Sequence, residues 1–233
     1  MSKELAKKET NDVAVVADLN AGFGAAPELD ANDLVITNVQ LMQSTSERVQ
    51  DGEFKLGDMI RKSTAELLGD FDKPIKLLPF HVEKMIYVVK DDGDRGEYIR
   101  TDDYRPKFEY EYEENGEKYF NIMNYRVYFL ESEDSMPIII NFNKSSRNTG
   151  KEIVTMMYAT NPRQSLGQAG RFVEIGSRKE KKGKNTWATF TMNPSDKASV
   201  AIQNAAVASY KMLGQTKVEP EHTVKDTNGK ELF

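Results

Sequence analysis

The sequence predicts a mainly β protein with a few α-helices, built on a bent antiparallel sheet. Two observations support this fold class. Long stretches alternate between apolar and polar residues with a period of two, which is typical of strands that bury one face. Between Met136 and Met192 the period changes from two to about 3.6 and back to two, which indicates a short helix packed across the sheet.

Composition narrows the class of protein. The 233 residues suffice for one domain with a sizeable core, and 30% of them are charged. No apolar run approaches the roughly 18 residues of a membrane span, and the first residues lack the apolar stretch of a secretory signal, so we expect a cytoplasmic protein, in the host cytoplasm if viral. The absence of cysteine and the presence of only two histidines leave little for metal or covalent chemistry, so we expect no metal and no cofactor.

The ends of the chain are expected to lie outside the core. Residues 1–33 are rich in Ala, Asp, Glu, Asn and Gly and predict a flexible arm, and residues 215–233 predict a polar tail. One domain should therefore span residues 34–214. Its first apolar segment, Leu34–Met42, fits a strand or a helix equally well.

The first three strands of the sheet are expected at residues 75–90, 119–131 and 137–143. Pro79 indicates a bulge or an edge in the first of them, where His81 is expected to be structural. Residues 91–118 carry eleven acids and five bases. We expect this acidic insertion to form a separate solvated hairpin that lies outside any groove for nucleic acid.

A helix is expected at residues 151–158, followed by two strands at residues 170–178 and 186–192. A final helix should follow at residues 197–213, capped by residues 193–196 and ended by Gly214. Three strands, a helix between the third and fourth strands, and two further strands give the order of a five-stranded antiparallel barrel.

Alternation within the last two strands predicts which side chains face the core. The inward residues are Val173, Ile175, Ala188, Phe190 and Met192. The only tryptophan, Trp187, then lies on the opposite face. The alternative, in which Trp187 is a core residue, fits the sequence equally well.

Positive charge is concentrated in the same part of the chain. Residues 143–185 contain ten Lys or Arg against three acids, a balance of +7 in a chain of net charge −5. Aromatic residues are interleaved with these cations, and single-stranded nucleic acid is bound by cations for phosphates and aromatic faces for bases. The pattern therefore predicts a groove for single-stranded DNA.

The order of elements is that of an OB barrel. With its acidic insertion, basic loops and terminal Phe233, the chain resembles a bacteriophage single-stranded DNA-binding protein of the replication type over residues 75–192 and the tail. The resemblance implies an OB-like barrel that binds and protects single-stranded DNA, without reading sequence, during replication, recombination and repair. Such proteins often end in a dense acidic run, whereas residues 223–233 hold two acids and two lysines, so recruitment of phage replication proteins through the tail stays open.

The residues expected to bind nucleic acid are the cations of this region and the nearby aromatic side chains. They are Lys144, Arg147, Lys151, Arg171, Phe172, Arg178, Lys179, Lys181, Lys182, Lys184, Trp187, Tyr128 and Tyr87.

Two other classes of function are weighed against this one. A virion or assembly protein of a phage, in which the sheet packs against further copies, is the alternative, and a homo-oligomer is compatible with either reading. A metal-dependent nuclease that uses Glu174 near Lys179 is disfavoured because such centres need several converging carboxylates. We therefore expect no enzymatic activity.

Overall fold

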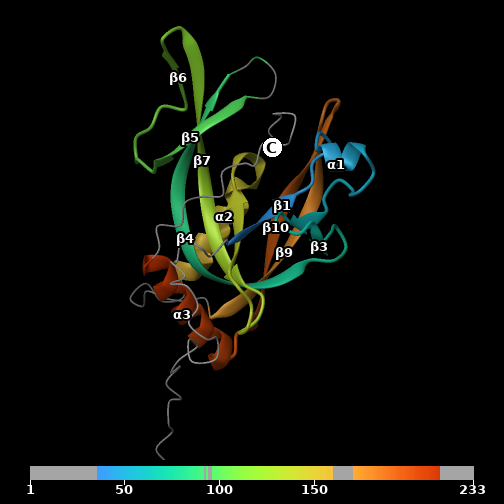
Figure 1. Cartoon of the computed structure of the whole chain (residues 1–233), viewed down its shortest axis with the longest axis vertical. Helices are drawn as coiled ribbons and strands as arrows, with labels where there is room; N and C mark the ends of the chain where they lie inside the picture. Colours follow the sequence, from blue (N-terminus) through green and yellow to red (C-terminus); the bar gives the residue numbers. More distant parts are fainter. Residues whose placement is uncertain (1–35, 92, 94–95, 160–169, 216–233) are drawn as a thin grey trace, which may run out of the picture.

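The computed structural model describes residues 36–91, 93, 96–159 and 170–215. The expected N-terminal arm and, apart from Gln215, the expected tail lie outside the described residues. The described chain is mainly β, with ten strands in one mixed sheet and a few helices, as Figure 1 shows. The predicted fold class, mainly β with helices, is confirmed.

The strands are β1 (Thr37–Leu41), β2 (Met59–Arg61), β3 (Glu66–Gly69), β4 (Ile75–Lys90), β5 (Glu97–Asp103), β6 (Glu111–Glu114), β7 (Glu117–Leu130), β8 (Ile138–Phe142), β9 (Arg171–Lys182) and β10 (Asn185–Lys197). The helices are α1 (Glu47–Gln50), the 3-10 helix η2 (Lys144–Ser146), α2 (Arg147–Ala159) and α3 (Val200–Gln215).

The main path through the sheet is β10-β9-β4-β7-β8-β1-β2-β3, and all of its neighbours are antiparallel except β1 and β8. The predicted order of three strands, a helix and two strands is confirmed as β4, β7, β8, α2, β9 and β10. Four of these strands lie in the order β9-β4-β7-β8, the 4-1-2-3 arrangement of a Greek key. The bulge predicted at Pro79 is present as a register shift between Pro79 and His81.

The prediction of a closed five-stranded barrel was wrong. Within the described sheet, β8 is paired on its second edge by β1 rather than by β10, and β2 and β3 continue the sheet from there. Alternation along a strand predicts which face is buried but not which edges meet. An extra strand from the start of the domain therefore occupies the position through which the barrel would have closed.

The outer edge of β10 is covered by side chains instead of a strand. Gln43 Nε2 donates to the carbonyl of Ala188 at 3.1 Å, and the Ala188 N–H donates to Gln43 Oε1 at 3.0 Å. The Phe190 N–H donates to Ser146 Oγ at 3.1 Å, while Thr149 Oγ1 donates to the Phe190 carbonyl at 2.8 Å. These bonds satisfy backbone groups that an uncovered edge would leave open to another chain.

The main core lies between the sheet and α2. Its fully buried members include Val127, Phe129, Ile140, Phe142, Ile153, Val173 and Ile175. Gly150 allows α2 to approach the sheet, because a Cβ at this position would lie 2.7 Å from the Cβ of Phe142. A second cluster, which includes Phe80, Tyr128 and Ile139, packs against Ile202 and Ala206 of α3.

Several predicted boundaries differ from the structure. Helix α2 begins at Arg147 rather than Lys151, and the undecided segment 34–42 contains a strand, β1. Residues 193–196 do not cap the last helix but continue β10, and the helix begins after Ser199, whose Oγ accepts from the Ile202 N–H at 3.4 Å. Residues 193 and 194 pair with β9, so this segment is extended and does not form the predicted helix cap.

The acidic insertion does not form a separate hairpin. Strand β5 pairs with the outer half of β4, and β6 pairs with the outer half of β7, so the local order is β5-β4-β7-β6. We call this four-stranded extension, residues 85–124, the acidic arm. In Figure 1 it projects from the body of the sheet at the upper left, while α1 and the tip of the β9–β10 hairpin lie at the upper right.

Candidate nucleic-acid interface

The turn between β9 and β10 presents a cluster of exposed cations. The strands pair without interruption from Lys182 and Asn185 at the turn to Val173 and Pro194, and the buried core residues lie in the part farther from the turn. Gly183 adopts a φ of +61° in the turn, a conformation that glycine accepts without strain. The exposed cations are Arg178, Lys179, Lys181, Lys182 and Lys184.

The segment that leads into α2 brings three more cations to this hairpin. Ser146 Oγ lies 3.0 Å from Thr189 Oγ1 and accepts from the Phe190 N–H, so η2 is held against β10. Lys144 and Arg147, which flank Ser146, are exposed, as is Lys151 one helical turn after Arg147. We call the exposed cations of this segment and of the β9–β10 turn, together with Trp187, the basic surface.

Most of these cations have no acidic partner. Among the described residues, the only ion pair of the basic surface joins Arg178 Nε to Glu180 Oε1 at 2.8 Å. Elsewhere in the sheet, cations are neutralised, as in the pair of Arg61 Nη2 with Glu131 Oε2 at 2.7 Å. The basic surface therefore keeps positive charge that phosphates can neutralise.

Trp187 lies on the strand face opposite the core. Ala188 and Phe190 are core residues, as predicted, and Trp187 is directly opposite Glu180 on β9. The indole is half-buried rather than free in solvent, and its Nε1 is covered with no hydrogen-bond partner in the described part of the chain. Its position beside Thr189 places a partly exposed ring between the hairpin cations and η2.

Two of the expected binding residues lie far from this surface. Arg171 and Phe172 begin β9, and the ten residues that separate Arg171 from Lys181 span about 33 Å in an extended strand. The ring of Phe172 packs against the cluster beside α3, with Lys76 Nζ 4.9 Å from its centroid. They cannot contact the same few nucleotides as the hairpin turn.

The two expected tyrosines belong to the middle of the sheet. Tyr128 is 1% exposed, and its hydroxyl donates to Glu83 Oε2 at 3.2 Å, so its ring has no free face for a base. Tyr87 is half-buried, donates to Asn141 Oδ1 at 2.9 Å and accepts from Asn124 Nδ2 at 2.9 Å. We leave Tyr128 out of the candidate interface.

Sequence reasoning missed the polar network to which these tyrosines belong. It crosses four strands and consists of His81, Glu83, Tyr87, Asn124, Arg126, Tyr128, Asn141 and Asn38. Arg126 is 6% exposed, with its Nη1 3.4 Å from Glu83 Oε2. The sequence feature that could have revealed the network is the spacing of polar residues at every second position in two long strands. Alternation alone predicts that this face of the strands is exposed to solvent.

The electrostatics of the network keep its ion pair charged. Burial alone would raise the pKa of Glu83, but His81, Arg126 and Tyr128 outweigh it and hold that pKa below its usual value. Burial alone would lower the pKa of Arg126, but Tyr87, Tyr128 and Glu83 outweigh it and raise that pKa. Burial raises the pKa of Tyr128, which stays a neutral hydrogen-bond donor.

The described residues offer neither a cluster of metal ligands nor a membrane-spanning helix. They contain no group of three or more His, Cys, Asp or Glu side chains placed to hold a metal ion. Among the described helices, none has the length and apolar character needed to cross a membrane.

Comparison with known proteins gives one match. Neither a curated protein nor a solved structure matches the chain. A protein-family model described as Pam3 phage gp34-like protein matches residues 7–219, which is most of the chain.

Proposed function

The chain belongs to the Pam3 phage gp34-like protein family, and from this premise we propose that it is a phage protein that binds single-stranded DNA without reading sequence. Its role is to protect that DNA during replication, recombination and repair, without catalysis. The observation that carries the proposal is the basic surface: eight exposed cations from two separate segments, seven of them with no ion pair among the described residues.

The chemistry of the surface suits a single strand. Lysine and arginine side chains neutralise phosphates, and counterion release then supplies affinity that does not depend on sequence. Trp187 offers a half-buried ring on the same hairpin as five of these cations, and a base stacked on such a ring contributes ~1–3 kcal/mol. Any base has a flat face, so neither contact selects a sequence.

The net charge of −5 does not oppose this proposal. The described residues of the acidic arm include nine acids and five bases, and Figure 1 shows the arm apart from the β9–β10 hairpin. Acidic surface elsewhere on the molecule limits nonspecific condensation on nucleic acid and steers the strand toward the basic surface.

The test is the affinity for labelled oligo(dT), measured by fluorescence anisotropy on the intact protein and on a charge reversal. The triple variant Lys181→Glu, Lys182→Glu and Lys184→Glu should bind every single-stranded sequence more weakly than the original protein. A matched control reverses three exposed lysines outside the basic surface: Lys107, Lys197 and Lys211. Equal affinity of both triple variants would refute the proposed surface.

A phage assembly protein is the second candidate. The observation that favours it is the acidic arm, which extends beyond the sheet body and exposes aromatic as well as acidic side chains. The same titration separates the two functions, because an assembly protein would show no salt-sensitive binding of oligo(dT).

A further inference from the structure

We propose that the acidic arm of one copy docks on the basic surface of a second copy, so that the protein associates head to tail. The proposal does not rest on DNA binding, although the arm and a DNA strand would compete for the same cations. It rests on three properties of the described chain: complementary charge, an exposed tyrosine ring on the arm, and the lack of an ion pair between the two surfaces within one molecule.

The acidic arm carries charge that its own residues leave unpaired. Three of its exposed acids, Glu109, Glu113 and Glu114, have no ion-pair partner among the described residues. They lie on or beside the edge strand β6, whose only partner is β7. Glu113 and Glu114 are neighbours on the strand and point to opposite faces, so this edge of the arm carries unpaired negative charge on both faces.

One exposed ring and several half-buried rings accompany these acids. Tyr110 is 65% exposed, and its ring centroid lies 5.9 Å from that of Phe120. Tyr112 stacks on Tyr119 with centroids 5.2 Å apart. Lysine side chains bind tyrosine faces as well as carboxylates, so the arm offers two kinds of contact to the same cations.

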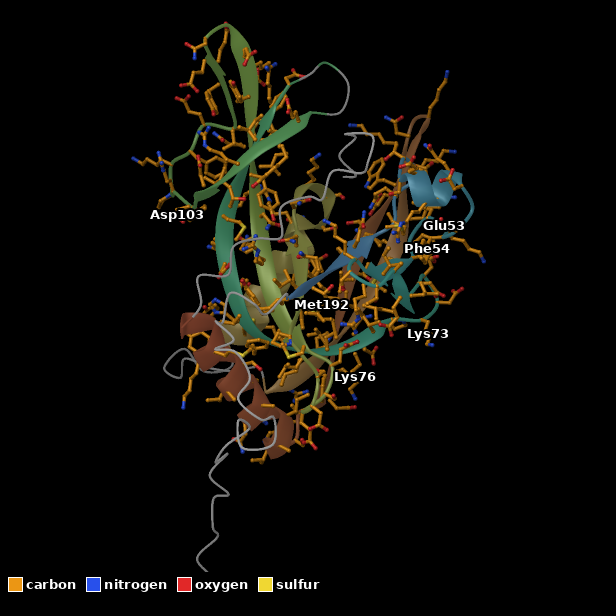
Figure 2. The ribbon with its side chains drawn as sticks, viewed as in Figure 1. Glu53, Phe54, Lys73, Lys76, Asp103 and Met192 are labelled. Atoms are coloured by element: carbon orange, nitrogen blue, oxygen red, sulfur yellow. The ribbon has the colours of Figure 1, made fainter. Side chains whose placement is uncertain are left out.

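The surface that would bind the acidic arm is the basic surface of another copy of the same protein. The basic surface has seven cations without an acidic partner in the described residues, and the arm has the matching acids. The two surfaces of one copy do not satisfy each other, since no ion pair among the described residues joins them. In Figure 2, Asp103 of the arm lies on one side of the molecule, and Glu53 and Phe54, beside the hairpin, lie on the other.

A contact between two different patches is heterologous, so a pair of copies still has one free acidic arm and one free basic surface. Such association produces rings or open chains rather than a symmetric dimer. Because the contact is between exposed charges, it should weaken as salt is added.

The experiment is sedimentation velocity of the full chain without DNA, at low and at high salt. We expect concentration-dependent oligomers at low salt that dissociate at high salt. Two triple variants reverse the charge on one partner surface each. The first changes Lys181, Lys182 and Lys184 to Glu, and the second carries Glu109→Lys, Glu113→Lys and Glu114→Lys. Each should weaken association about tenfold or more.

A combined variant gives the sharper result. With both triple reversals in one chain the signs are exchanged but still complementary, so self-association should return. The matched control changes three exposed acids outside the arm, Asp72→Lys, Glu133→Lys and Asp134→Lys, and should associate like the original protein. A monomer at low salt, or a combined variant that stays monomeric while folded by circular dichroism, would overturn the proposal. Neither result depends on whether the protein binds oligo(dT).

Discussion

At the scale of single residues, Trp187 reports directly on the basic surface because it is the only tryptophan in the chain. A base stacked on its half-buried ring should quench its emission, and Trp187→Ala should lower the binding free energy for oligo(dT) by ~1–3 kcal/mol. Titrating intrinsic fluorescence with oligo(dT) measures the first effect, and anisotropy measures the second.

The control for this residue is Tyr110→Ala, which removes a more exposed ring from the acidic arm and should leave the affinity unchanged. If the emission of Trp187 does not change when oligo(dT) is added, and the alanine variant loses stability rather than affinity, Trp187 is a structural residue.

Glu83 gives a prediction about pH. Its folded pKa is lowered by His81, Arg126 and Tyr128 against the effect of burial, so its contribution to stability is present above the unfolded pKa of about 4.3 and is lost as pH falls through the folded pKa. Glu83→Gln should therefore be less stable than the original protein at pH 7, because buried Arg126 loses its counter-charge.

Chemical denaturation at several pH values tests this prediction. The difference in unfolding free energy between the two proteins should shrink as pH falls below ~4.3, where the unfolded chain takes up the proton, and should be lost as pH falls through the lowered pKa of folded Glu83. An exposed carboxylate in the turn after β7 provides the control, since Glu133→Gln should have little effect at any pH. A difference that stays constant down to pH 2 would contradict the role given to Glu83.

Single-residue orientation was predictable where one face of a strand meets the core. Val173, Ile175, Ala188 and Phe190 are buried as alternation required. Arg126 was not predictable, because a long cation in a strand normally points to solvent and its burial depends on carboxylate and hydroxyl groups from a neighbouring strand. Which residues face each other on neighbouring strands depends on the register of the sheet, and the hydrophobic period of one strand does not predict that register.

At the scale of elements, the edge of β10 depends on Gln43. Its side-chain amide forms two hydrogen bonds with Ala188 and so joins the loop after β1 to the last strand. Gln43→Ala should lower the unfolding free energy by ~1–3 kcal/mol, because both backbone groups of Ala188 lose their partners. Chemical denaturation measures the effect.

The exposed Gln50, at the end of α1, is the matched control, and Gln50→Ala should change stability little. Equal stability of the two variants would show that water replaces Gln43 at the edge without cost.

Elements were predicted better than their ends. The strand at residues 75–90 has the predicted bounds, whereas α2 begins four residues earlier than predicted. Gly150 caused this difference: glycine discourages a helix by propensity, but here its missing side chain lets the first turn of α2 lie directly on Phe142. Tertiary packing therefore decided a boundary that local preference placed elsewhere.

At the scale of the whole molecule, the sequence predicted the order of elements but not the closure of the sheet. The Greek-key core follows from strands that could each be recognised, while β1, β2 and β3 come from short segments with little periodicity. The candidate interface was predictable in part, since the hairpin cations and Trp187 come together while Arg171, Phe172 and Tyr128 lie elsewhere. The density of charge along the sequence located the basic region. Which of its residues lie together on one surface depends on the fold, which the sequence did not predict in full.

The most direct test of the account is the dependence of single-strand affinity on salt. If about five cations of the basic surface touch phosphates, the plot of log K against log salt for oligo(dT) should have a slope of about −3.5. The Lys181→Glu, Lys182→Glu and Lys184→Glu variant should have a slope shallower by about 2, because three of those contacts are lost. A flat plot for the original protein, or the same slope for both proteins, would contradict the claim that this surface binds single-stranded DNA.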